Sequence, residues 1–153
     1  MGERVAIVMG SVSDKDTAAK AEAVLKDFGV EFETHVISAH RTPNRARSFA
    51  ASLETRGIGV VIAVAGLAAH LPGVLASLTL TPVIGVPAAA GPLAGNDALL
   101  SIVQMPPGVP VACVGIGNAK NAAVLAVQIL SVKTPGLRER LEEYRAQFGD
   151  DAD

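Results

Sequence analysis

The stretch "GVVIAVAG", from Gly59 to Gly66, decides the fold, because it is a short run of β-branched and other apolar residues without a polar position. Continuous apolarity over such a length predicts a strand buried on both faces, as strands inside parallel sheets are. Further runs that are typical of strands occur at Arg4–Gly10, at Val30–Ser38, in "TPVIGVP" and in "VPVACVGIG". We therefore predict five strands, of which only the second alternates between polar and apolar residues in its middle.

Alanine-rich segments with apolar residues at helical spacing separate these runs. The predicted helices are Ser13–Phe28, Thr42–Thr55, Ala68–Leu78, Asn118–Leu130 and Leu137–Phe148. In the second helix, Thr42 is the expected N-cap and Pro43 the first helical residue. Strands that alternate with helices through short connections predict an α/β fold. We expect a three-layer sandwich with a parallel sheet, flavodoxin-like or Rossmann-like, in one domain over residues 1–153.

The last predicted helix follows the segment "SVKTPG", which sets it apart from the rest of the chain. Its apolar residues Leu137, Leu141, Tyr144 and Phe148 fall on one stripe of a helix. Such a stripe could dock on its own domain or on a neighbouring subunit. We predict that this C-terminal helical extension, residues 131–153, packs on a neighbouring subunit.

The composition excludes several classes of protein. Hydrophobic residues make up 50% of the chain but aromatic residues only 3%, so alanine, valine, leucine and isoleucine must build the core. A net charge of −2 gives no basic surface for nucleic acid. The single cysteine, Cys113, lies in an apolar run and is interpreted as a small core residue. Without a signal peptide or an apolar stretch that could cross a bilayer, the chain is expected to be cytoplasmic and without a membrane partner.

Polar side chains gather where two predicted strands end. "MGSVSD", residues 9–14, offers the hydroxyls of Ser11 and Ser13 and the free amides at a helix start, which favour an anion such as phosphate. The alternative is that Ser13 only caps the helix and that Asp14 interacts with its positive end.

The segment "ISAHRTP", residues 37–43, is the stronger indication of a site. Imidazole is the side chain whose ordinary pKa lies closest to neutrality, and His40 carries one. Arg41 can hold a phosphate through two hydrogen bonds, and Ser38 adds a donor or acceptor. The alternative is an ordinary helix start with solvated side chains. Because both polar loops lie at the same sheet edge, we interpret them as one binding site.

A third strand is followed by "AGLAAHLPG", residues 65–73, whose small residues allow backbone amides to approach a flat ligand. Its His70, taken alone, is more typical of a structural or interface histidine. His35 lies inside a predicted strand and receives no role. The sequence has neither metal-ligand spacing nor a nucleophile elbow, so we expect no metal. One histidine beside anion-binding loops fits proton transfer on a phosphorylated small molecule.

Taken together, "VAIVMGSVSD", "SAHRTP", "AAHLPG", "TPVIGVP", "LSIVQMPPGVPV" and "NAAVLAVQIL" resemble, in this order and over nearly the whole chain, the N5-carboxyaminoimidazole ribonucleotide mutase family of purine biosynthesis. The resemblance implies a flavodoxin-like fold, a homo-octamer with active sites at subunit interfaces, and no metal or organic cofactor. It implies transfer of a carboxyl group from the exocyclic nitrogen to C4 of aminoimidazole ribonucleotide. It also implies functional coupling to an ATP-dependent enzyme that forms the carbamate.

The same resemblance implies roles for single residues in the first two loops. Ser11 matches a ligand-binding serine, Asp14 a ribose-binding aspartate and Ser13 a serine near the phosphate. Ser38 and Arg41 match substrate-binding positions, with the arginine on the phosphate.

In the second loop the resemblance also makes His40 the catalytic histidine. Gly66, Ala68 and His70 match the loop that lines the base and the carbon dioxide pocket. The implied mechanism releases carbon dioxide beside the aminoimidazole, and the ring carbon then attacks it while the histidine removes the C4 proton.

Two departures from the family's pattern keep alternatives open. Leu67 stands where the family has a glycine, and its side chain could narrow the pocket or disfavour a positive φ. The loop "GNAKNAA" is shortened and resembles the "PKNAA" of a related carboxylase class that uses carbon dioxide directly. The alternatives are direct carboxylation, a non-catalytic nucleotide-binding homologue, and an enzyme acting on another heterocyclic nucleotide.

Overall fold

All neighbouring strands of the central sheet run parallel, in the order β2-β1-β3-β4-β5. The structure is a computed structural model that describes residues 3–149. The strands are β1 (Arg4–Met9), β2 (Phe32–Val36), β3 (Ile58–Ala65), β4 (Val83–Pro87) and β5 (Ala112–Cys113). This strand order is that of flavodoxin-like folds, and it confirms the predicted fold class.

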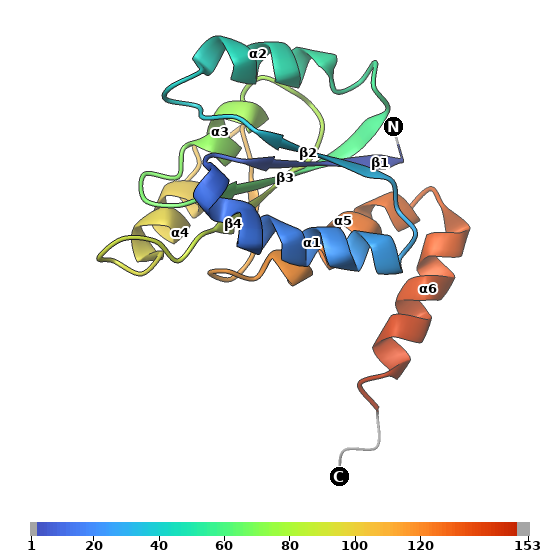
Figure 1. Cartoon of the computed structure of the whole chain (residues 1–153). Helices are drawn as coiled ribbons and strands as arrows, with labels where there is room; N and C mark the ends of the chain where they lie inside the picture. Colours follow the sequence, from blue (N-terminus) through green and yellow to red (C-terminus); the bar gives the residue numbers. More distant parts are fainter. Residues whose placement is uncertain (1–2, 150–153) are drawn as a thin grey trace.

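Helices cover both faces of the sheet (Figure 1). They are α1 (Lys15–Asp27), α2 (Pro43–Ser52), α3 (Leu71–Ala76), α4 (Asn96–Val103), α5 (Ala119–Ser131) and α6 (Pro135–Ala146), with a short 3-10 helix η1 (Val12–Asp14) before α1. α1 and α5 pack on one face, and α2, α3 and α4 pack on the other.

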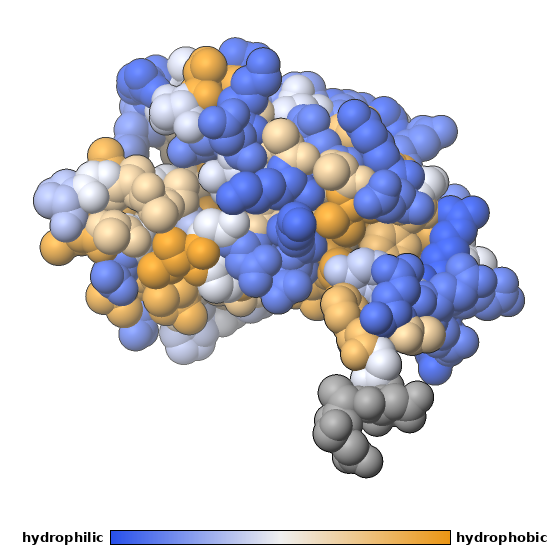
Figure 2. Space-filling view, turned by 60° about the horizontal axis from the view of Figure 1, so that its bottom comes forward, coloured by the Kyte–Doolittle hydropathy of each residue, from blue (hydrophilic) through white to orange (hydrophobic). Residues whose placement is uncertain are grey.

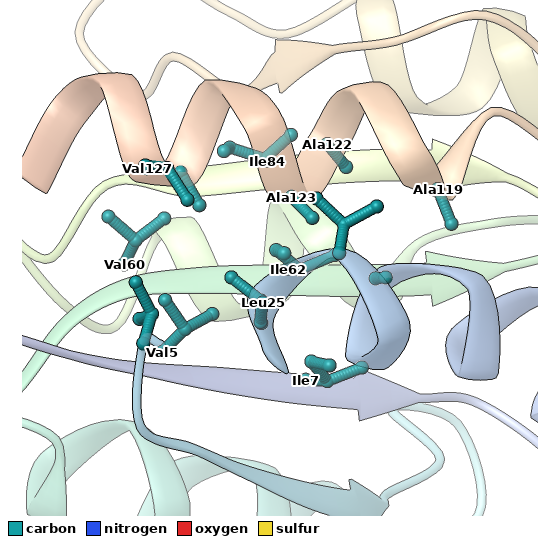
Figure 3. Packing of buried hydrophobic residues seen from close by; sticks show 14 of the residues in the cluster. Val5, Ile7, Leu25, Val60, Ile62, Ile84, Ala119, Ala122, Ala123 and Val127 are labelled. Carbon is teal, nitrogen blue, oxygen red and sulfur yellow. The ribbon is translucent and has the colours of Figure 1, made fainter. Parts of the chain in front are cut away.

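The sheet residues alternate between two apolar cores. In β1, Val5 and Ile7 face α1 and α5, whereas Ala6 and Val8 face the opposite layer. Figure 3 shows Val5 and Ile7 packed among Leu25, Val60 and Ile62. Ile7 is fully buried, and burial of such a side chain stabilises a fold by about 1.5–3 kcal/mol. All eight residues of β3 are buried, as its apolarity predicts.

The C-terminal helix α6 packs on its own chain along most of its length. Leu137 and Leu141 are buried in the α1–α5 core, and the ring of Tyr144 lies 5.3 Å from that of Phe28. Arg140 also donates a hydrogen bond to the carbonyl of Phe28. Figure 1 shows the end of α6 projecting away from the sheet. Packing of residues 131–153 on a neighbouring subunit stays a prediction.

Several element boundaries differ from the predicted ones. α3 begins at Leu71 instead of Ala68, because the amides of Ala69 and His70 each bond to the carbonyl two residues earlier and form tight turns. Pro72 lies in the first turn of this helix, as expected. β5 pairs only over Ala112–Cys113, and Cys113 is half-buried at the core's edge instead of inside it.

The N-cap of α2 is Thr42, as predicted, and Pro43 follows at the first helical position. The Thr42 hydroxyl does not cap the helix, however, because it donates instead to the carbonyl of Ser38, with an oxygen–oxygen distance of 2.8 Å. This bond ties the start of α2 back to the loop after β2.

The surface is hydrophilic over much of the face shown in Figure 2, and hydrophobic residues gather toward the side where Figure 1 places α4. Within residues 3–149, no helix combines the length and the apolarity that crossing a membrane requires.

Candidate active site

A cleft of about 460 Å³ opens at the carboxyl edge of the sheet. It lies where the strand order reverses between β1 and its two neighbours β2 and β3, the position at which parallel α/β folds bind ligands. The loops after these three strands line it. Every residue that the sequence singled out as a site residue is among its lining residues: Ser11, Ser13, Asp14, Ser38, His40, Arg41, Gly66, Ala68 and His70.

The first loop is held by a reciprocal capping box. The Ser11 hydroxyl accepts a hydrogen bond from the amide of Ser13, at 3.3 Å, and a carboxylate oxygen of Asp14 accepts one from the amide of Ser11, at 3.2 Å. Ser11 therefore caps η1, whereas Asp14 stands at the N-cap position of α1 without a side-chain cap bond, so the alternative in which Ser13 caps the helix is wrong.

Asp14 is only 8% exposed although it lines the cleft. Burial raises the pKa of its carboxyl above the ordinary value of 3.8, and the hydrogen bond from the Ser11 amide opposes this rise. A desolvated carboxylate held in place by a backbone amide is well suited to accept hydrogen bonds from a ligand hydroxyl.

The second loop positions Arg41 through Ser38. The Ser38 hydroxyl accepts from the Arg41 amide at 3.2 Å and lies 3.4 Å from its Nε. Within residues 3–149, no carboxylate lies within ion-pair distance of the Arg41 guanidinium. An exposed arginine without an acidic partner remains available to an anionic ligand.

The two histidines of the cleft contact each other. His40 Nε2 and His70 Nδ1 lie 2.8 Å apart, and the rings meet edge to face with centroids 4.8 Å apart. Because each ring comes from a different loop, this bond joins the end of β2 to the end of β3. One of the two nitrogens must carry the proton, so the bond couples the tautomers of the two rings. The sequence did not predict this pairing.

The segment after β4 forms a further wall of the cleft. Ala90 lines it, and the amide of Ala88 bonds to the carbonyl of Ala65, which extends the pairing of β3 and β4. A Cβ added to Gly66 would lie 3.1 Å from the Ala90 Cβ, so the two loops are in close contact. Sequence reasoning missed this wall, although "AAAGPLAG" directly after a buried strand is the signal that would have found it.

Leu67 also lines the cleft, and its φ is 54°. The leucine therefore does adopt the left-handed backbone that glycine favours, and its side chain lies at the cleft as expected. Within the part of the chain that the structure describes, no group of three or more potential metal ligands occurs.

Comparison with known proteins places this geometry in a family. The AIR carboxylase family model matches residues 4–151. The chain belongs to the AIR carboxylase family. A curated relative named N5-carboxyaminoimidazole ribonucleotide mutase, from Pyrococcus abyssi, is 60% identical over 93% of this chain and 82% of its own length. A relative with the same name from Thermotoga maritima is 53% identical over 95% of this chain and 85% of its own.

A solved structure of the family has the same architecture. The crystal structure of Treponema denticola PurE superposes with a TM-score of 0.86 at 31% identity, covering 94% of this chain and 89% of that one. The family model matches residues 4–151, so the residues that line the cleft described above belong to the matched part of the chain.

Proposed function

We propose that the chain interconverts N5-carboxyaminoimidazole ribonucleotide and 4-carboxy-5-aminoimidazole ribonucleotide in purine biosynthesis. The observation that carries this proposal is the cleft at the β1–β3 edge, where an arginine without an acidic partner among residues 3–149, a buried carboxylate and a histidine pair line one cavity. The relatives that are 51–60% identical and carry the mutase name support the same reaction.

The polar residues of the first two loops suit the phosphate and the ribose of a ribonucleotide. We assign the phosphate to Arg41, with Ser13 and Ser38 near it, because the guanidinium has no acidic partner in the described chain. We assign the ribose hydroxyls to Asp14, whose carboxylate is fixed by the Ser11 amide. Holding the phosphate and the ribose orients the distant base, which lowers the entropic cost of reaching the transition state.

The base then lies against the third loop, where Gly66, Ala68 and His70 line the cleft. His40 performs the proton transfers. The carbamate C–N bond breaks to give carbon dioxide, and the nitrogen takes a proton from the imidazole. C4 then attacks the carbon dioxide, and its own proton returns to the imidazole, so the cycle closes without any co-reactant.

The bond between His40 and His70 suits an imidazole that must act as acid and base in one cycle. When His40 Nε2 donates to His70, Nδ1 of His40 is free to accept a proton. When His70 donates to His40, Nδ1 of His40 carries a proton that it can give. Exchange of the two roles therefore needs three proton movements: one proton arrives at Nδ1 of His40, the proton between the rings moves from His40 to His70, and one proton leaves Nε2 of His70.

The cleft of one chain is open, with both histidines exposed. Retention of carbon dioxide requires a closed and dry site. We therefore propose a cytoplasmic homo-octamer in which neighbouring copies complete the active site, residues 131–153 pack on a neighbour, and residues 1–153 form one domain. A metabolic partner is an ATP-dependent enzyme that forms the carbamate.

A comparison of substrates tests the function. The purified enzyme is given the synthetic carbamate ribonucleotide or, separately, aminoimidazole ribonucleotide with bicarbonate, and the carboxylated product is measured spectrophotometrically. A mutase converts the carbamate at low bicarbonate. Turnover only with aminoimidazole ribonucleotide and bicarbonate would instead establish direct carboxylation, and turnover with neither would leave a nucleotide-binding protein.

A further inference from the structure

We propose that Leu67 is a positioning residue, which clasps the loop after β4 to the loop after β3 and thereby keeps carbon dioxide in the cleft between the two steps of the reaction. This inference rests on the proposed function. It concerns a residue that touches no reacting atom in that mechanism and that acts through the wall of the cleft.

The first observation is the contact between Leu67 and Gly91. A Cβ added to Gly91 would lie 2.5 Å from Leu67 Cδ2, so the leucine side chain fills the position that a side chain at Gly91 would take. Gly91 itself has a φ of 68°, a conformation that glycine adopts without strain. The side chain of Leu67 therefore packs into the space that the missing side chain of Gly91 leaves.

The second observation is the backbone of Leu67. Its φ of 54° is unfavourable for a residue with a Cβ, and Ala94, with a φ of 50°, is the other such residue in the described chain. The unfavourable backbone aims the Leu67 side chain at the Gly91 loop. Backbone strain of this kind persists where the surrounding contacts hold it, and strained residues cluster at functional sites.

The third observation is the position of this contact on the cleft. Leu67 and Ala90 both line it, and they come from the loops after β3 and β4. Gly66 packs closely against Ala90 one residue earlier. If the contact at Leu67 is lost, the Ala88–Ala65 hydrogen bond and the packing of Gly66 on Ala90 still join the bases of these loops, and a gap opens farther out, in the loop that also carries His70.

Loss of the Leu67 contact should let carbon dioxide escape from the cleft during the reaction. Carbon dioxide forms when the carbamate bond breaks, and it either reacts with C4 or leaves, in which case aminoimidazole ribonucleotide is released as a side product. A looser wall favours escape over capture. The ratio of aminoimidazole ribonucleotide released to carboxylated product formed therefore reports on the wall, and it does not depend on the amount of active enzyme.

The test measures this ratio with the carbamate substrate, after subtraction of its breakdown without enzyme. For Leu67→Gly we expect the ratio to rise about fivefold, the size expected when one half-exposed leucine contact is lost. Leu67→Met keeps a flexible apolar side chain at the same place, so it should stay near the wild-type ratio. Leu80→Ala is the matched control, since Leu80 is fully exposed and lies outside the lining of this cleft.

A double-mutant cycle tests the contact itself. Gly91→Ala should lower the melting temperature more in the wild-type chain, where the new methyl group meets Leu67, than in the Leu67→Gly chain. An equal fall in melting temperature in both backgrounds would overturn the proposed contact between Leu67 and Gly91.

The two proposals fail in different ways. If the wild-type enzyme makes no carboxylated product from the carbamate, the proposed function is wrong, and this inference falls with it. If the wild type does make that product and the ratio is unchanged in Leu67→Gly, or rises equally in Leu80→Ala, only the role of Leu67 is overturned.

Discussion

Replacing Asp14 distinguishes its contribution to the stability of the fold from its contribution to ligand binding. Within residues 3–149, Asp14 is the buried charged side chain, and its carboxylate holds the Ser11 amide at 3.2 Å. In Asp14→Asn the amide oxygen can still accept that hydrogen bond, and the cost of burying a charge disappears. We expect the free energy of unfolding at neutral pH to stay within about 1 kcal/mol of the wild type. Asp14→Ala removes the acceptor and should lose about 1–2 kcal/mol.

The raised pKa of Asp14 fixes the sign of the pH dependence. A carboxyl whose pKa is higher in the folded chain than in the unfolded chain contributes stability at low pH, and this contribution is lost as the pH rises through the folded pKa. Asp14→Asn should therefore become more stable relative to the wild type as the pH rises above the ordinary carboxyl pKa of 3.8. Urea denaturation at a series of pH values measures this difference.

The activity of Asp14→Asn should fall, although its stability is preserved. A hydrogen bond from a ribose hydroxyl to a carboxylate contributes about 1.5–3 kcal/mol, so its loss should lower kcat/KM for the carbamate ribonucleotide about 10- to 100-fold. The assay is steady-state product formation by Asp14→Asn at a pH where the variant is fully folded. A variant that keeps wild-type kcat/KM, or whose activity falls only in step with the unfolded fraction, would refute the assignment of Asp14 to the ligand.

Three further perturbations test neighbouring groups. His70→Ala should lower kcat about 10- to 100-fold with a smaller change in KM, because His40 keeps its imidazole but loses the partner 2.8 Å away; an equal rise in KM would point to a binding role instead. Arg41→Gln should raise KM about tenfold or more for the nucleotide and leave binding of the dephosphorylated nucleoside unchanged in calorimetry; an equal effect on both ligands would contradict a phosphate contact. Burial, together with the charge of Arg45, lowers the pKa of His35 from its ordinary value of 6.5, so stability should fall as the pH drops through the folded pKa. In His35→Asn the urea midpoint should therefore depend less on pH over that range. An unchanged pH dependence would contradict this role of His35.

The parallel sheet and its cleft could be predicted from the sequence because both follow from local patterns. The apolar run of β3 fixes a strand buried on two faces, and polar loops after parallel strands meet at one edge. The loops that carry Ser11, Ser38 and His70 therefore had to converge once the strand order was flavodoxin-like.

Features that depend on contacts between distant loops could not be predicted. The His40–His70 bond, the packing of Gly66 on Ala90 and the fit of Leu67 to Gly91 each join segments that only the strand order brings together. The late start of α3 is a local feature that the sequence also did not reveal, since a positive φ at residue 67 and two tight turns precede the helix. Apolar periodicity carries no signal for such turns.

The most direct test of the central claim is a comparison of turnover and nucleotide binding in His40→Asn. Asparagine preserves the polarity of the side chain but cannot shuttle a proton. The proposed mechanism predicts that turnover of the carbamate ribonucleotide falls by about 10²- to 10⁴-fold, while the dissociation constant of the nucleotide product, measured by calorimetry, stays within a few-fold of the wild type. Turnover that survives at the wild-type rate would contradict the assignment of proton transfer to His40, and with it the account of the cleft as a mutase active site.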